Sequence, residues 1–176
     1  MDAKRLGIYL SDHHAGAISG LELARRTERE NHGNPVGHFL ADLLPELRED
    51  LALLVEVMKV LEVRADALKS RAAWLLEKLA RLKLNGTWVR YSPLSRLVEL
   101  EALCSAIEGR LSLWSTLARL QGQDPRLARF DFVALIARGE MQLLALQRLR
   151  ALAADVAFSD EPMPLGSGEE PAIASY

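Results

Sequence analysis

Several residue types and patterns are scarce in this chain of 176 residues. Cysteine occurs once, at Cys104, so no disulfide can form within the chain, and a reducing compartment fits this composition. The net charge is only −2, so the total charge does not indicate binding to nucleic acid or to an anionic membrane. No run approaches the ~20 apolar residues that a membrane-spanning helix needs. Acidic residues interrupt the N-terminal region, so we expect no signal peptide and a cytoplasmic location.

Familiar catalytic motifs are also missing. The chain has no glycine-rich phosphate loop, no hydrolase nucleophile elbow and no zinc-type spacing of cysteine and histidine. Cys104 falls on an apolar stripe with no histidine expected nearby, which predicts a buried structural thiol and not a nucleophile. The sequence therefore indicates no catalytic residue.

The residues that are abundant favour helix. Leu, Ala, Glu and Arg dominate, β-branched residues are few, and apolar residues recur at intervals of three and four. Capping patterns such as Asn34-Pro35 and Ser92-Pro93 mark where helices begin. Together these signals predict five helices, over residues 3–30, 36–61, 66–85, 93–120 and from 126 or 130 to 158.

The connections between these helices predict the architecture. The turns near residues 31–35 and 121–125 are short, which forces each flanking pair of helices to be antiparallel. The helix over 66–85 and the irregular segment 87–91 form a crossover long enough to run the length of the bundle, so that the fourth helix begins at the same end as the second. We expect an all-α fold with one helical-bundle domain over residues 1–158. Residues 159–176, rich in proline, glycine and acids, are expected to form a disordered acidic tail.

This layout resembles the ferritin-like superfamily, in which one long crossover joins two helical hairpins. The resemblance covers about residues 3–158 and implies a four-helix bundle with an additional helix in the crossover. Four short segments are also similar to segments of uncharacterised bacterial proteins, a resemblance that implies no activity: 9–13, 22–26, 83–86 and 92–94.

The metal-binding members of this superfamily use a glutamate from each of two helices and a Glu-x-x-His pair from each of the other two. The matching register here is Glu46-x-x-Glu49 on the second helix and Glu140-x-x-Leu143 on the fifth. Both histidine positions hold other residues, and all four histidines of the chain fall within its first 38 residues. The resemblance therefore predicts no intact standard di-iron site.

Acidic residues nevertheless fall near the apolar stripes in the middle of the predicted bundle. Counting residues from the turns places them at similar heights at 1.5 Å per residue, and a histidine lies close to the same level. These residues form the candidate metal site: Glu46, Asp50, Glu108, Glu140 and His13.

Two interpretations of this cluster remain open. In the first, the carboxylates bind iron or manganese at an atypical site, which would give a redox-active metalloprotein, because unpaired charges are costly inside a bundle. In the second, the acids pair with His13, Arg96, Gln147 and Arg150, and no cofactor is bound. Adjacent residues on a helix point about 100° apart, so His13 and His14 cannot easily share one ion, and we expect His13 to face inward and to bond to Asp50.

The hypothesis for function is a non-catalytic helical-bundle protein with a structural or interaction role, forming a homodimer through one face of the bundle. The alternative is the metal-binding protein just described. Residues 67–98 are strongly basic, so they either contact an acidic partner or lie beside the acidic second helix. Nucleic acid and membrane are not expected partners.

Overall fold

The computed structural model describes residues 2–63 and 91–159. Within these two ranges the chain forms helices and no strand, which confirms the all-α prediction. The elements are α1 (Ala3–Glu30), α2 (Pro35–Val60), α4 (Pro93–Leu120), the short 3₁₀ helix η2 (Pro125–Leu127) and α5 (Phe132–Ala157). The helix expected over 66–85, residues 87–90 of the irregular segment, and the tail after Ser159 lie outside the described residues.

Side-chain caps fix the helix ends where the sequence predicts them. Asp2 accepts hydrogen bonds from the backbone N–H groups of the first turn of α1, and Asn34 does the same for α2. Ser92 caps α4 through the N–H of Ser95. Gly33 has a φ of +87°, the left-handed conformation that lets the chain reverse between α1 and α2. The predicted bounds 3–30 and 93–120 are confirmed, and α2 begins and ends one residue before the predicted 36–61. The last helix begins later than the predicted residue 126 or 130, because residues 125–127 form the 3₁₀ helix η2 and α5 starts only at Phe132.

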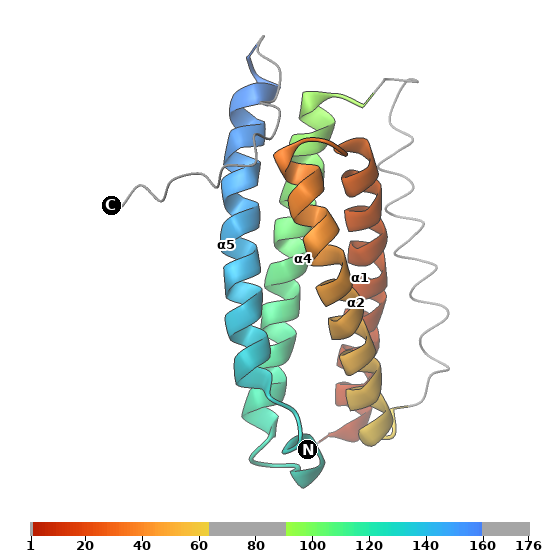
Figure 1. Cartoon of the computed structure of the whole chain (residues 1–176). Helices are drawn as coiled ribbons and strands as arrows, with labels where there is room; N and C mark the ends of the chain where they lie inside the picture. Colours follow the sequence, from red (N-terminus) through yellow and green to blue (C-terminus); the bar gives the residue numbers. More distant parts are fainter. Residues whose placement is uncertain (1, 64–90, 160–176) are drawn as a thin grey trace.

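The long helices form two antiparallel hairpins that stand side by side (Figure 1). α1 pairs with α2, α4 pairs with α5, and α1 also packs against α4. The turn between α1 and α2 lies at the same end of the bundle as the start of α4, so α2 and α4 run in the same direction (Figure 1). The two hairpins and the common direction of α2 and α4 agree with the prediction, and the expected crossover lies outside the described residues. No helix in the described ranges is long and apolar enough to cross a membrane.

The core consists of two apolar clusters, one in each half of the bundle. One contains Leu40, Leu100 and Leu146, and the other contains Trp114 and Phe132 among its largest buried side chains. On α2, α4 and α5, a few buried polar residues fall between the members of these two clusters. The polar residues thus divide the core near its middle.

The rotation of α5 differs from the prediction. Apolar spacing along this helix predicts that Gln147 and Phe158 face the core, but Gln147 is exposed and Phe158 is 80% exposed. Residues on another side of the helix are buried instead: Gly139, Gln142, Leu146, Ala153 and Val156. The prediction fails because α5 carries apolar residues on nearly every side, so hydrophobic periodicity does not define one inner face.

Candidate functional site

Asp50 is the centre of the polar group inside the bundle. It lies on α2, is only 5% exposed, and was predicted to face inward. Its Oδ2 accepts a hydrogen bond of 2.5 Å from Nη1 of Arg110 on α4. Its Oδ1 accepts another of 2.5 Å from Nη2 of Arg138 on α5. One carboxylate therefore joins three helices through two charged pairs.

Glu46 lies one helical turn before Asp50 and joins the same group. Nε2 of Gln142 on α5 donates to Oε2 of Glu46, and the amide oxygen of Gln142 accepts from Nη2 of Arg110. At the edge of the group, Nη1 of Arg138 lies 3.3 Å from Oε2 of the exposed Glu49. We call Glu46, Asp50, Arg110, Arg138 and Gln142 the polar layer.

In the polar layer, the positive charges of Arg110 and Arg138 are compensated by the negative charge of Asp50. Burial lowers the pKa of Arg110, and the attraction of Asp50 opposes that effect. Burial also acts to lower the pKa of Arg138, but the charge and hydrogen bond of Asp50 outweigh it, so the pKa of Arg138 is raised. Both guanidinium groups consequently stay charged beside the carboxylates.

Glu108 and Glu140 do not belong to the polar layer. Glu140 was predicted to lie within the apolar stripe of its helix and Glu108 near the edge of its own, but both side chains are exposed. The predicted heights hold, since Arg110 and Gln142 contact the acids of α2 from positions only two residues away. Two residues correspond to a rotation of about 200° around a helix, which turns a side chain from the core to the solvent. That part of the prediction is wrong.

The geometry consequently does not assemble the candidate metal ligands. Among the described residues, no group of three or more His, Cys, Asp and Glu side chains is arranged to hold a metal ion. The partners expected for the acids also differ. Arg150 lies 3.9 Å from Glu101 instead, and Arg96 donates to Asn31. Arg110, Arg138 and Gln142 were missed, although each sits at the height of Glu46 and Asp50 and could have been found from that height alone.

His13 was expected to be the inward-facing histidine of α1, but the structure buries His14 more deeply. His14 is the buried one, at 8% exposure, and its Nδ1 has no hydrogen-bond partner among the described residues. His13 is half-buried and packs edge-on against Tyr9, with ring centroids 4.5 Å apart. The hydrogen bonds to Asp50 come from Arg110 and Arg138, so the predicted bond from His13 is not formed. Burial lowers the pKa of both histidines, and for His13 the charge of Asp12 opposes that effect.

A cavity of about 430 Å³ lies between α1, α2 and α4. Small residues on facing helices, such as Gly16, Gly20 and Ala106, leave this space open. His13 and Asp50 reach its wall, but most of the lining is apolar. The cavity therefore provides volume next to the polar layer and brings no set of reactive groups together.

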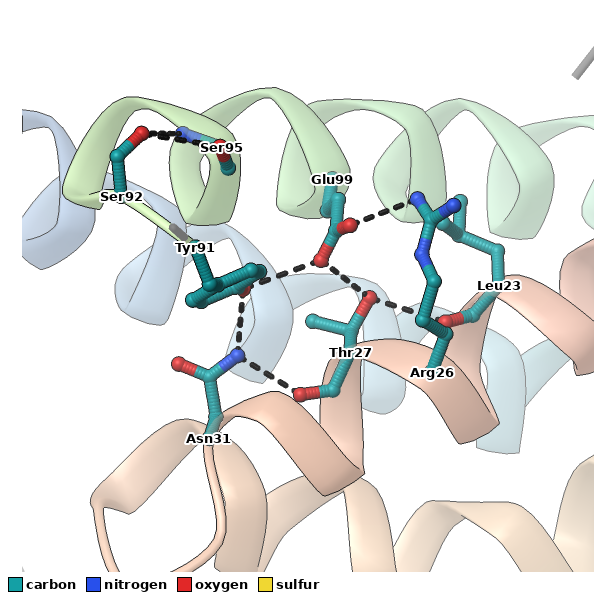
Figure 2. A network of polar contacts seen from close by, with 8 residues as sticks. All are labelled: Leu23, Arg26, Thr27, Asn31, Tyr91, Ser92, Ser95 and Glu99. Carbon is teal, nitrogen blue, oxygen red and sulfur yellow. Dashed lines mark hydrogen bonds and ion pairs between the residues drawn. The ribbon is translucent and has the colours of Figure 1, made fainter. Parts of the chain in front are cut away.

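A second polar cluster lies at the end of the bundle where α1 meets α4 (Figure 2). Glu99 of α4 accepts from Nη2 of Arg26 at 2.7 Å and from the hydroxyl of Thr27 at 2.9 Å. The Tyr91 hydroxyl accepts from Nδ2 of Asn31 at 2.6 Å and donates to Glu99 at 3.0 Å. These bonds join the end of α1 to the start of α4. They form a structural lock between these two helices.

Tyr91 is the last residue of the irregular segment 87–91, and Arg96 lies in the basic segment 67–98. Burial raises the pKa of Tyr91 well above its ordinary value, with the neighbouring Glu99 adding to the effect, so the hydroxyl stays protonated and can donate. Arg96 belongs to the basic segment 67–98 and donates from Nε to Asn31. The remaining basic residues of that segment lie outside the described ranges.

Cys104 is buried, as predicted. Burial raises the pKa of its thiol, which disfavours the thiolate that a nucleophile or a metal ligand requires. The prediction of a buried thiol is confirmed.

Comparison of the chain with protein-family models, with curated proteins and with solved structures finds no match in any of the three.

Proposed function

We propose that this chain is a non-catalytic helical-bundle protein of the ferritin-like type, with a structural or interaction role in the cytoplasm. The parallel course of α2 and α4 and the two antiparallel hairpins support the ferritin-like type. The polar layer supports the role. It occupies the middle of the bundle, where metal-binding members of that superfamily place their ligands.

The single observation that carries the proposal is the pairing of Asp50 with Arg110 and Arg138. A divalent cation at Asp50 would have to displace two guanidinium groups that already satisfy both carboxylate oxygens. It would also sit beside two positive charges in a region of low polarity, where repulsion is strong. Glu46 and Asp50 therefore serve to connect α2 with the neighbouring helices, and their carboxylates are not free to bind an ion.

Metal analysis tests this proposal most directly. The untagged full chain is incubated with Fe(II), Mn(II) or Zn(II), desalted, and measured by inductively coupled plasma mass spectrometry. We expect each metal content to equal that of a matched Asp50→Asn, Glu46→Gln variant. Stoichiometric metal in the wild type that is lost in this variant would overturn the proposal and favour the alternative, an atypical carboxylate metal site with redox activity.

A further inference from the structure

The cavity between α1, α2 and α4 has a deeply buried apolar interior. Leu43 and Leu54 of α2 and Leu103 and Ile107 of α4 line it, and each is at most 4% exposed. Its volume of about 430 Å³ lies in the range of ~300 to 1,000 Å³ that is usual for pockets that hold small molecules. The cavity therefore has the size and the lining of a site for a largely apolar ligand.

Small residues on α1 and α4 leave one side of this cavity accessible from solvent. Ala102 and Ala106 are exposed, and Gly16 and Gly109 are half-buried. In the described ranges, a Cβ at Gly16 or at Gly109 meets nothing within 4 Å. Larger side chains at these positions would fill that side, so the small ones give a ligand a way in.

Two hydrogen-bond donors at the cavity wall have no partner among the described residues. Four buried side-chain nitrogens in these ranges lack one, and two of the four belong to residues that line the cavity, Nε of Arg110 and Nε1 of Trp114. Trp114 is only 1% exposed, and a buried N–H without an acceptor is costly. The two residues are four apart on α4, so they lie one turn apart on the same face. One carbonyl oxygen has two lone pairs and can accept from both.

The charges at the wall favour a neutral ligand. Among the described lining residues, Arg110 carries the positive charge, while Asp50 and Asp12 carry negative ones. Burial lowers the pKa of His13, although the charge of Asp12 opposes this effect, so the imidazole stays neutral near pH 7. An anion would consequently face a wall with a net negative charge. A cation would find both oxygens of Asp50 already bonded to Arg110 and Arg138.

We propose that this cavity binds a neutral, apolar small molecule that carries a carbonyl group, whose oxygen accepts hydrogen bonds from Nε1 of Trp114 and Nε of Arg110. The hydrocarbon part of the molecule packs against the buried leucines. This inference goes beyond the structural or interaction role proposed above. It involves no metal, so its test is independent of the metal analysis.

Three related compounds test the proposal by isothermal titration calorimetry on the full chain. Benzophenone is neutral and has one carbonyl oxygen, and we expect saturable binding of one molecule per chain. Diphenylmethane has the same two rings without that oxygen and should bind about fivefold more weakly. 4-Benzoylbenzoate adds a carboxylate and should bind at least about tenfold more weakly, because the charge loses its hydration. No saturable binding of benzophenone would overturn the proposal, as would equal or tighter binding of either other compound.

The variant Trp114→Phe tests the assigned hydrogen bond. It keeps an aromatic ring beside Phe132, on which the indole stacks with ring centroids 6.0 Å apart, and it removes the N–H. The affinity for benzophenone should fall about fivefold, while that for diphenylmethane should change by less than about twofold. An equal change for both compounds would contradict the assignment, because altered packing affects them alike.

Two further variants locate the site. Gly16→Leu and Gly109→Leu place side chains in the cavity and should each weaken benzophenone binding at least about tenfold. Ala134→Leu, at an exposed position of α5 outside the cavity, is the control and should bind as wild type does. Circular dichroism of all variants should match that of wild type. Loss of binding in Ala134→Leu with full binding in both glycine variants would overturn the site.

Benzophenone also labels its own binding site, because near-ultraviolet light attaches it to nearby C–H bonds. Peptide mass spectrometry after irradiation should find the label on α1, α2 or α4, at residues that line the cavity. Labelling should disappear when diphenylmethane is present in excess. A label confined to α5, or one that diphenylmethane does not displace, would overturn the proposal.

Discussion

Arg110 of α4 donates from Nη1 to Oδ2 of Asp50 on α2 across 2.5 Å, and both side chains are at least 89% buried, with exposures of 11% and 6%. The two residues belong to different hairpins. Their pairing therefore holds the two hairpins together at the level where polar residues separate the two apolar clusters of the core.

Replacing Asp50 with Ala should lower the free energy of unfolding by about 3 kcal/mol, because it leaves the buried Arg110 without its counter-charge. Urea denaturation followed by circular dichroism measures this change. The matched control is Asp42→Ala, which removes an exposed carboxylate from the same helix and should alter stability by no more than ~0.5 kcal/mol. Equal effects of the two substitutions would contradict a structural role for the polar layer.

Removing both charges together should be far less damaging than removing one. In the double variant Asp50→Leu, Arg110→Met, no buried charge is left uncompensated between these two positions, and apolar replacements of similar volume are often neutral. A double-mutant cycle in urea should therefore give a coupling energy of about 2 kcal/mol or more. Additive losses from the two single changes would show that the pair does not act as a unit.

At the end of the bundle, Tyr91→Phe should cost about 1 kcal/mol of stability, because Asn31 and Glu99 each lose a hydrogen-bond partner. Thermal unfolding monitored at a helical signal measures the loss. Tyr9→Phe serves as the control. Its hydroxyl bonds to one side chain, that of Thr116, whereas the Tyr91 hydroxyl bonds to two, so its removal should cost less. A larger effect at Tyr9 would contradict the lock between α1 and α4.

The buried His14 predicts a dependence of stability on pH. Burial lowers its pKa in the folded chain below the ordinary value of 6.5, so the unfolded chain binds more protons as the pH falls. The contribution to stability is complete above pH 6.5 and is lost as the pH drops below it. The free energy of unfolding, measured above pH 6.5 and about one pH unit below it, should therefore decrease on acidification.

The variant His14→Gln should make that decrease smaller. The same change at the exposed His38 of α2 removes an imidazole from the surface and serves as the control, whose pH dependence should follow that of wild type. Stability that rises on acidification, or a slope unaffected by His14→Gln, would contradict the assignment.

Replacing Gly37 with Ala should lower the stability of the fold, whereas the same substitution at Gly109 should raise it. A Cβ at Gly37 would lie 2.2 Å from the carbonyl oxygen of Asn31, a backbone atom held in the turn between α1 and α2, so Gly37→Ala should cost about 1 to 3 kcal/mol. A Cβ at Gly109 meets nothing within 4 Å. Gly109→Ala should therefore raise stability by about 0.5 to 1 kcal/mol through helix propensity. Thermal melting of the two variants should move in opposite directions.

The sequence by itself determined the ends of α1 and α4, the ends of α2 to within one residue, and how high each residue lies in the bundle. Caps such as Asn34 and Ser92 and the terminal glycine at Gly33 are local signals, and a helix of known rise converts a residue number directly into a height. This is why Asp50 was expected at the level where Arg110 and Arg138 now meet it. Both the helix boundaries and these heights depend only on residues close together in the chain.

Only the tertiary structure decided how each helix is rotated about its own axis. α2 has a clean apolar stripe, so its inner face and the burial of Asp50 were predictable. α5 is apolar on almost every side, so periodicity could not choose between Gln142, which is buried, and Glu140, which is exposed. That choice depends on packing against α2 and α4. This rotation leaves Val133, Met141, Leu144 and Leu152 exposed on the outer side of α5.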